Sequence, residues 1–380
     1  MKTSKSSKGK NILSIVSLAA MLLAVVVAVV LVLNPQLNKT PVNAPDAKTT
    51  AASTTTATDA VVTTTTTTVP TPDILPEPEP DPSFTITLSF AGDTVFSDIG
   101  AFANHAATQG TDYFLEKVRP IFEQDDFTIV NFESVLTDRE LTPVEKDYTP
   151  AFWFKSPTSN IEILSNSGVD GVLLSNNHIM DYEQEGYNDT VAAITEAGLQ
   201  YGDHSRTMYF EKNGFTVAVI CSGMWGEYQT TRIINCIKTA EEKSDYQIVF
   251  FHGGEEKIHE PEEWKRNAAR KLVDNGADLV IGSHPHVLQP REVYNGVDIV
   301  YSIGNFCYAG NRHPENRTVI YQTELTIGGD LTLQSAQSTI IPCYVYTGDA
   351  NNYQPAVVED NEEIKNKILD FMEGKIESPV

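Results

Sequence analysis

The chain has 380 residues, of which 41% are hydrophobic and 9% aromatic, so it can bury a sizeable core and global disorder is excluded. It carries 27 Lys and Arg against 51 Asp and Glu, a net charge of −24, and without the four lysines that precede residue 34 the balance is 23 against 51, or −28. A body this acidic argues against sequence-independent binding of nucleic acid and against docking on an anionic membrane surface.

The N-terminal segment is predicted to anchor the chain in a membrane. Residues 1–11 hold the four lysines and are expected to stay cytoplasmic, while Ile12–Leu33 contains no charged residue, Gly or Pro. A helix of this length crosses a hydrocarbon core of about 30 Å. The nearest small-residue pattern, Val42-Asn43-Ala44, lies well beyond the apolar run. We therefore expect an uncleaved signal-anchor with the body outside the cell; a removed signal peptide is the alternative and gives the body the same location.

Residues 34–83 are predicted to form a disordered linker. Twelve of the twenty residues 49–68 are Thr, and Pro recurs at alternate positions from Pro76 to Pro82. Such a composition offers too little apolar area to offset the entropy of ordering, and its Pro-rich end favours an extended spacer.

From Phe84 the pattern changes to short β-branched runs alternating with amphipathic stretches, which is typical of a layered α/β fold. The expected strands are 85–91, 127–131, 171–175, 215–221, 247–251, 279–282 and 299–303, followed by a hairpin of 318–327 and 331–341. The expected helices are 113–123, 159–167, 186–197 and 262–275. We place one domain at 84–345 and a C-terminal tail at 346–380, with a surface helix over 361–373.

Polar residues gather where the predicted strands end. They are Asp93; Asn131 and Glu133; Asn177, His178 and Asp181; His252 and Glu255; His284 and His286; and Asn305. The carboxyl ends of strands line the ligand crevice of open α/β sheets. Carboxylate, carboxamide and imidazole together are ligands for Mn, Zn or Fe, so the pattern predicts a site for one or two divalent ions.

Several polar and aromatic residues near the predicted strand ends also have a purely structural interpretation. Asp93 and the pair Asn176-Asn177 are common turn residues, and Trp225 can serve packing as well as line a cleft. The four cysteines, at 221, 236, 307 and 343, show no metal-binding spacing; outside the cell they can form disulfides or remain buried thiols.

The ordered motifs resemble those of the CapA family, named for poly-γ-glutamate capsule biosynthesis and related to calcineurin-like metallophosphoesterases. They are Phe90-Ala91-Gly92-Asp93, Asn131-Phe132-Glu133-Ser134, Ser175-Asn176-Asn177-His178 with Asp181, His252-x-Gly254-Glu255, Ser283-His284-Pro285-His286 and Gly304-Asn305-Phe306. The resemblance spans roughly residues 84–345. It implies a four-layer α/β/β/α sandwich with a metal centre at the strand ends.

The resemblance also implies roles for the site residues. Asp93 and His286 would hold one metal, and Asn177, His252 and His284 the other. Glu133 would bridge the two. His178 would face the substrate without binding metal, oriented by Asp181. Asn131, Glu255 and Asn305 are expected beside the ligands.

Two positions depart from the family patterns. Val95 stands where phosphoesterases have a His, which removes one metal ligand. Gly253 stands where CapA relatives usually have an aromatic residue, which is expected to open the cleft.

Three functions agree with the sequence. The first is a surface protein that acts on poly-γ-glutamate during its synthesis, export or hydrolysis, with metal-dependent hydrolysis favoured. The second is a secreted phosphoesterase. The third is a non-catalytic scaffold for a membrane-bound polymer synthase.

Overall fold

The computed structural model describes residues 82–310, 312 and 316–380. The predicted anchor, Ile12–Leu33, and nearly all of the predicted linker lie outside these residues. Among the helices of the described part, none is both long and apolar enough to cross a membrane.

Two β-sheets form the centre of the described unit. The strands of the seven-stranded sheet, in spatial order, are β15 (Ala356–Val357), β14 (Leu333–Tyr344), β13 (Arg317–Ile327), β1 (Phe84–Thr94), β2 (Phe127–Phe132), β5 (Gly171–Leu173) and β6 (Gln200–Gly202). The strands of the six-stranded sheet are β11 (Leu288–Tyr294), β12 (Val297–Ile303), β10 (Leu279–Ser283), β9 (Tyr246–His252), β8 (Phe215–Gly223) and β7 (Met208–Lys212). A separate short pair joins β3 (Val135–Leu136) to β4 (Lys155–Ser156).

Each large sheet has a parallel part and an antiparallel edge. Strands β1, β2, β5 and β6 run parallel, as do β8, β9, β10 and β12. The predicted hairpin is confirmed as β13 and β14, which pair antiparallel from Arg317 opposite Tyr344 to Ile327 opposite Leu333. The parallel strands are buried along most of their length, which explains their nearly continuous hydrophobic sequences.

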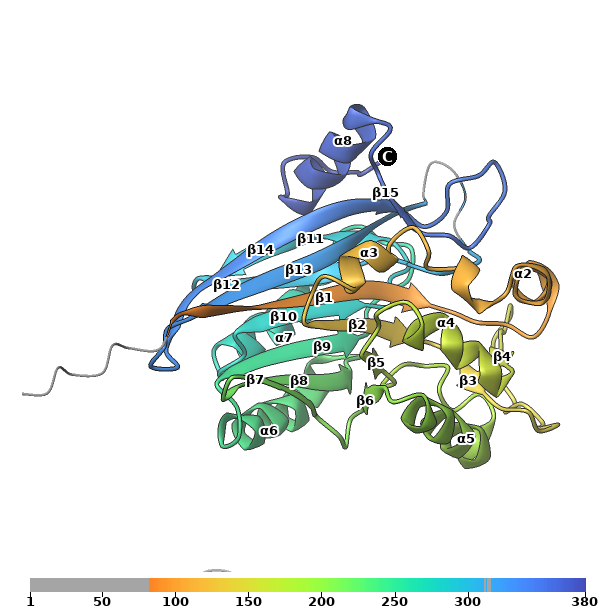
Figure 1. The fold of residues 1–380 in the computed structure, drawn as a ribbon, viewed down its shortest axis with the longest axis horizontal. Coiled ribbons are helices and arrows are strands. Elements are labelled where there is room, and N and C mark those ends of the chain that lie inside the picture. Colours follow the sequence, from red (N-terminus) through yellow and green to blue (C-terminus); the bar gives the residue numbers. More distant parts are fainter. Residues whose placement is uncertain (1–81, 311, 313–315) are drawn as a thin grey trace, which may run out of the picture. The chain divides into compact units, whose positions relative to one another are not determined.

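Helices cover the outer face of each sheet, and the mixed α/β architecture predicted from the sequence is confirmed (Figure 1). Helices α2 (Gly100–Gln109), α3 (Arg119–Phe122), α4 (Glu162–Ser165) and α5 (Glu183–Glu196) pack on the seven-stranded sheet. Helices α6 (Thr230–Glu241) and α7 (Glu263–Val273) pack on the six-stranded sheet. Between the sheets lies an apolar core that includes Phe90, Val219 and Phe250, so helices, sheet, sheet and helices follow one another in four layers.

The C-terminal segment belongs to the same compact unit. Strand β15 extends the seven-stranded sheet, and α8 (Glu362–Met372) contacts β11 and β14, one strand of each sheet. Its apolar side, with Ile368, Phe371 and Met372, is buried in the core between the sheets. The helix predicted over 361–373 is therefore exposed on one side only.

The predicted helix over 113–123 is interrupted. A 3₁₀ turn, Thr111–Tyr113, is followed by α3, whose first turn contains Pro120. Proline has no amide hydrogen and clashes with the preceding turn, so it fits at the start of a helix but not inside one. Helices α2 and α6 were not predicted. The four cysteines are free thiols, three of them buried.

Candidate metal centre

The parallel strands of both sheets deliver the predicted polar residues to one place. Asp93 is near the end of β1, and Asn131 is near the end of β2. In the other sheet, His252 ends β9 and the segment 284–286 follows β10 directly. Asn305 forms an isolated parallel bridge with Asp93, which joins the end of β12 to β1 across the two sheets.

Asp93 lies at the centre of this group and is fully buried. One carboxylate oxygen, Oδ2, lies 2.9 Å from His286 Nδ1. The other, Oδ1, accepts a hydrogen bond of 2.7 Å from Asn131 and another from the Ser283 hydroxyl. The backbone amide of His284 points at both oxygens from 3.3 Å. The carboxylate is thus fixed by both sheets.

Hydrogen-bond acceptors outnumber donors around Asn131. Its amide nitrogen lies 2.7 Å from Glu133 Oε1 and 2.9 Å from His252 Nδ1, in addition to Asp93. An amide nitrogen has two hydrogens and cannot serve three acceptors fully. Asn131 Oδ1 and Glu133 Oε2 are buried without any partner. Buried oxygens without donors are costly, and a cation is the group that relieves such an excess of acceptors.

Three further atoms that could bind a metal lie together: His252 Nε2, Asn177 Oδ1 and His284 Nδ1. His252 Nε2 lies 2.8 Å from Asn177 Oδ1 and 2.9 Å from His284 Nδ1. When Nδ1 accepts from Asn131, the only ring proton is on Nε2, where it faces two acceptors at once. Neutral imidazole nitrogens and a carboxamide oxygen at such spacing fit a divalent ion.

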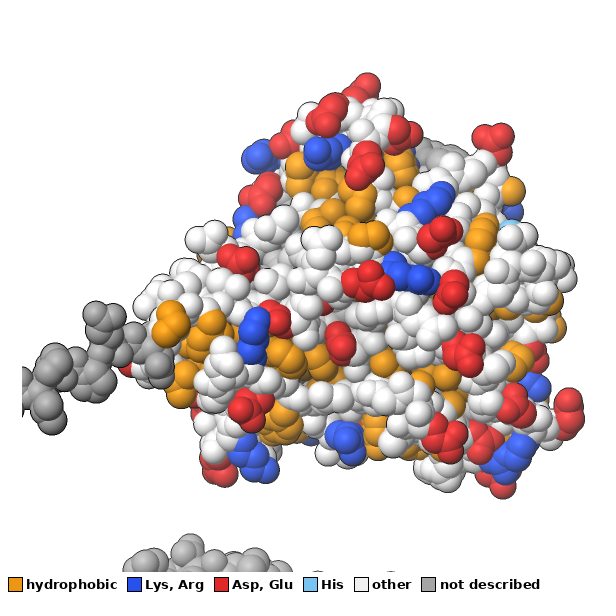
Figure 2. All heavy atoms as spheres, in the orientation of Figure 1, with side chains coloured by type: hydrophobic (Ala, Val, Ile, Leu, Met, Phe, Trp, Pro, Cys, Tyr) orange, Lys and Arg blue, Asp and Glu red, His pale blue; other side chains and the backbone are white. Residues whose placement is uncertain are grey.

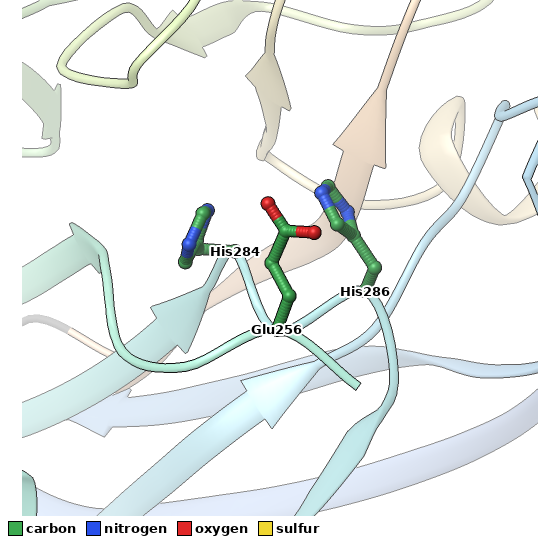
Figure 3. Close-up of side chains that lie close together, drawn as sticks. All are labelled: Glu256, His284 and His286. Atoms are coloured by element: carbon green, nitrogen blue, oxygen red, sulfur yellow. The ribbon is translucent and has the colours of Figure 1, made fainter. Parts of the chain in front are cut away.

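The turn His284–His286 carries backbone strain. His284 has φ +99° and His286 has φ +58°, in the left-handed region that non-glycine residues seldom adopt. Such strain is typical of functional sites, because surrounding contacts must maintain it. Glu256, from the segment after β9, also lies in the site. The Glu256 carboxylate points between the rings of His284 and His286 (Figure 3).

Two groups of candidate ligands result, and both fit a metal ion. Asp93, Glu133 and His252 form a buried group whose ligand atoms all lie within 4.8 Å of one another. Glu256, His284 and His286 form a second, with an exposed carboxylate and two buried rings. Both groups combine carboxylate oxygen with imidazole nitrogen.

Burial and neighbouring charge shift the pKa values of these side chains. Burial raises the pKa of the Glu133 carboxyl well above its usual range, and the nearby charge of Asp93 raises it further. Burial alone would also raise the pKa of Asp93, but contacts with His286 and His252 hold it well below its usual range. Burial, then the nearby His286, lowers the pKa of His284 to about 3. Burial and the neighbouring His284 likewise lower the pKa of His252. The imidazoles of His252 and His284 are therefore neutral, the state in which they bind metals.

His178 and Asp181 form a pair beside the proposed ligands. His178 Nδ1 lies 2.9 Å from Asp181 Oδ2, and both residues are buried. Asn176 shapes the turn, since its side-chain oxygen accepts from the backbone amides of His178 and Ile179. The pairing leaves His178 Nε2 as the ring nitrogen for proton transfer.

Lys146 completes this pair and was not predicted. Its ammonium group lies 2.6 Å from Asp181 Oδ1 and donates to the backbone carbonyl of Phe152. Asp181 Oδ2 also accepts from the backbone amide of Phe154, whose ring lies 4.4 Å from the His178 ring. The loop 144–154 is thereby tied to the Asp181 carboxylate. Its aromatic residues Tyr148, Phe152 and Trp153 are exposed.

The two departures from the family patterns have different consequences. Val95 is buried and offers no ligand. A Cβ atom at Gly253 would lie 1.8 Å from the carbonyl oxygen of Met224, so glycine permits a close approach of two backbones and does not open a cleft. An aromatic side chain is nevertheless present at the site, since the ring centre of Trp225 is 5.6 Å from that of His252 and 4.7 Å from that of His284.

The structure brings together nearly all residues predicted for the site. Asp93, Glu133, Asn177, His252, His284 and His286 lie at the strand ends with Asn131 and Asn305 beside them. Glu255 is exposed, and the carboxylate beside the two histidines belongs to Glu256. Of the residues that were missed, Glu256 is adjacent to a recognised motif, whereas no sequence signal marks Lys146.

The sequence is similar to a protein-family model and to several known proteins. The family model described as "Bacterial capsule synthesis protein PGA_cap" matches residues 87–309. The chain is 30% identical to the "PGA biosynthesis protein CapA" of Bacillus subtilis over 59% of this chain and 63% of that protein. It is also 30% identical to the "Capsule biosynthesis protein CapA" of Bacillus anthracis, over 52% of this chain and 54% of that protein.

More distant similarities were also found. The chain is 25% identical to a probable polyglutamine synthesis accessory protein of Mycobacterium tuberculosis, over 47% of this chain and 55% of that protein. A crystal structure from Thermus thermophilus aligns with 68% of this chain and 99% of its own, at 12% identity and a TM-score of 0.36, too low to support an argument. The match covers between about half and two thirds of the length of these three curated relatives.

Proposed function

The chain belongs to the family of bacterial capsule synthesis proteins PGA_cap, and from that premise we propose that it acts on poly-γ-glutamate through a divalent-metal centre. The reaction we propose is hydrolysis of the polymer's amide backbone. The observation that carries the proposal is the excess of buried acceptors around Asn131, together with the partnerless oxygen of Glu133. Without a cation, this arrangement would bury unsatisfied oxygens and a carboxyl group whose pKa is strongly raised.

The chain's own residues would divide the work. Asp93, Glu133, Asn177, His252, His284 and His286 would hold the metal, with Glu256 as an additional carboxylate. A divalent ion there would polarise the scissile carbonyl and lower the pKa of a bound water. His178 would supply or remove a proton at the leaving nitrogen through Nε2. Asp181 and Lys146 would keep its ring in place through Nδ1.

We further propose that the protein is anchored in the cell membrane with its body outside the cell. The charge-free run Ile12–Leu33 and the lysines before it support this location. An extracellular site would meet a polyanionic chain, and metal ions would supply the positive charge that an acidic body lacks. The anchor would also place the body near a membrane-bound polymer synthase.

Product analysis tests this function. Purified full-length protein is incubated with Mn²⁺ and either γ-glutamyl polymer or an aryl phosphate. We expect the polymer to shorten in the presence of metal, and Glu133→Gln to lose that activity. Hydrolysis of the aryl phosphate alone would instead identify a phosphoesterase. Full metal content with neither product would identify a scaffold. Either of these two results, the phosphoesterase or the scaffold, would refute the proposed hydrolysis of the polymer.

A further inference from the structure

A cavity lies away from the proposed metal ligands. It has a volume of about 340 Å³ and is bounded by the beginning of β13, the end of β14, β15 and α8. Its lining includes Arg317, Tyr344, Thr347, Glu359, Asp360 and Ile364. Figure 2 shows apolar side chains in the region between α8 and the sheet beneath it. None of the residues assigned to the metal centre lines this cavity.

The cavity contains a buried arginine that forms no ion pair with any residue that the structure describes. Arg317 is only 7% exposed, and its Nε is buried without a hydrogen-bond partner. Its guanidinium donates to Asn316 Oδ1 at 2.7 Å and lies 5.3 Å from the centre of the Tyr344 ring. Burial lowers the pKa of Arg317, and the nearby Tyr344 and Tyr346 partly oppose that shift.

An unpaired buried guanidinium is unusual and calls for an anion. Buried charges in proteins are normally paired, because removing an ion from water is costly. Arginine presents a planar fork of donors that matches a carboxylate. At the rim of the cavity, Lys117 donates to the Thr347 hydroxyl at 2.7 Å and adds a second positive charge.

The lining of the cavity also carries negative charge. Glu359 and Asp360 are exposed, and Asp360 Oδ1 accepts from the Tyr344 hydroxyl at 3.2 Å. A simple anion would be repelled by these carboxylates. A ligand that carries both a carboxylate and an ammonium group matches both charges of the lining, and Val357 and Ile364 offer apolar contact.

We propose that this cavity binds an α-amino-acid group, with its carboxylate on Arg317 and its ammonium toward Glu359 and Asp360. The volume suits a single residue of this kind. Two sources share this chemistry: a free amino acid, and the amino-terminal residue of a γ-linked glutamyl chain. Neither requires the metal centre, so the proposal stands apart from the proposed hydrolysis.

Calorimetry and thermal unfolding of the full-length protein in the presence of chelator test the proposal. The probes are L-glutamate, D-glutamate, a γ-linked glutamyl oligomer, propionate and propylamine. We expect glutamate or the oligomer to bind, and to raise the melting temperature by roughly 5 °C at a hundredfold excess over Kd. Propionate and propylamine, which each have one of the two charges, should bind at least tenfold more weakly. Binding of glutamate without the oligomer identifies a free amino acid; binding of the oligomer alone identifies a chain end.

Variants separate a ligand-binding role from a structural one. Arg317→Met should abolish binding without lowering the melting temperature of the free protein, because it removes an unpaired buried charge. Arg317→Lys retains the charge and should weaken binding by tenfold or more. Glu359→Gln with Asp360→Asn should weaken glutamate and leave propionate unchanged. The proposal is overturned if no probe binds, if propionate binds as well as glutamate, or if both Arg317 variants bind like the wild type.

Discussion

The substitution Lys146→Met tests whether the loop 144–154 is held by a buried ion pair. The Lys146 and Asp181 side chains are only 8% and 1% exposed, and their charged atoms lie 2.6 Å apart. Methionine retains the length and most of the apolar contact of the lysine side chain. It removes the positive charge, the hydrogen bond to the Phe152 carbonyl and the contact with the Trp153 ring.

The expected cost follows from the burial of Asp181. Removing one partner of a buried ion pair typically destabilises a protein by about 3–5 kcal/mol, because the remaining charge is left without compensation. Asp181 would keep its contacts with His178 and the Phe154 amide, so we expect a loss near the lower end, about 3 kcal/mol. The double variant Lys146→Met/Asp181→Asn should lose less than the sum of the two single variants, since it leaves no unpaired charge.

Urea unfolding at constant m-value measures these differences. Lys238→Met is the matched control, because Lys238 pairs with Glu241 at 2.7 Å on an exposed helix surface and should lose at most about 1 kcal/mol. If Lys146→Met loses no more than this control, the pair does not organise the loop, and the positioning role of Lys146 is refuted.

Three further predictions concern the site and its surroundings. If the protein is a hydrolase, His178→Ala should keep its metal content while activity falls by about 10²–10⁴, whereas Glu133→Ala should lose both; loss of metal from His178→Ala would make it a ligand. Burial lowers the pKa of Lys265 from 10.5 to about 7. Between about pH 7 and pH 10.5, Lys265 therefore releases its proton on folding. The free energy of unfolding should rise with pH in this range by up to about 1.4 kcal/mol per pH unit. That rise should be missing in Lys265→Met, and equal pH slopes in urea titrations would contradict the burial argument. Gly253→Ala should lower the unfolding free energy by about 3 kcal/mol or more, since its Cβ would overlap the Met224 carbonyl, and an unchanged urea midpoint would show that the two backbones can separate.

The sequence allowed the position of the site to be predicted because strand ends obey a simple rule. Buried parallel strands have continuous apolar sequences, so their ends can be read directly, and parallel strands bring their carboxyl ends to the same edge. Asp93, His252 and His284 were identified in this way. The α/β class follows from the same alternation of strands and helices.

Residues placed by irregular loops could not be predicted in this way. Lys146 reaches Asp181 from a loop without periodicity, and Glu256 takes the place expected for Glu255 because of the course of the chain after His252. Arg317 gave no signal because its significance lies in its burial without an ion pair among the residues that the structure describes. Gly253 was expected to open a cleft. Its close contact with the backbone carbonyl of Met224 was missed, because such a contact cannot be inferred from local sequence.

Metal analysis of the full-length protein tests the central claim most directly. Wild-type protein and the His284→Ala/His286→Ala variant are stripped with chelator, titrated with Mn²⁺ and compared for bound metal and melting temperature. We predict that the wild type binds at least one ion per chain and melts higher with metal, because a ligand of the folded state stabilises it, while the variant binds none and shows no shift. Equal binding by both proteins, or no binding by a folded wild type, would contradict a metal centre at these strand ends.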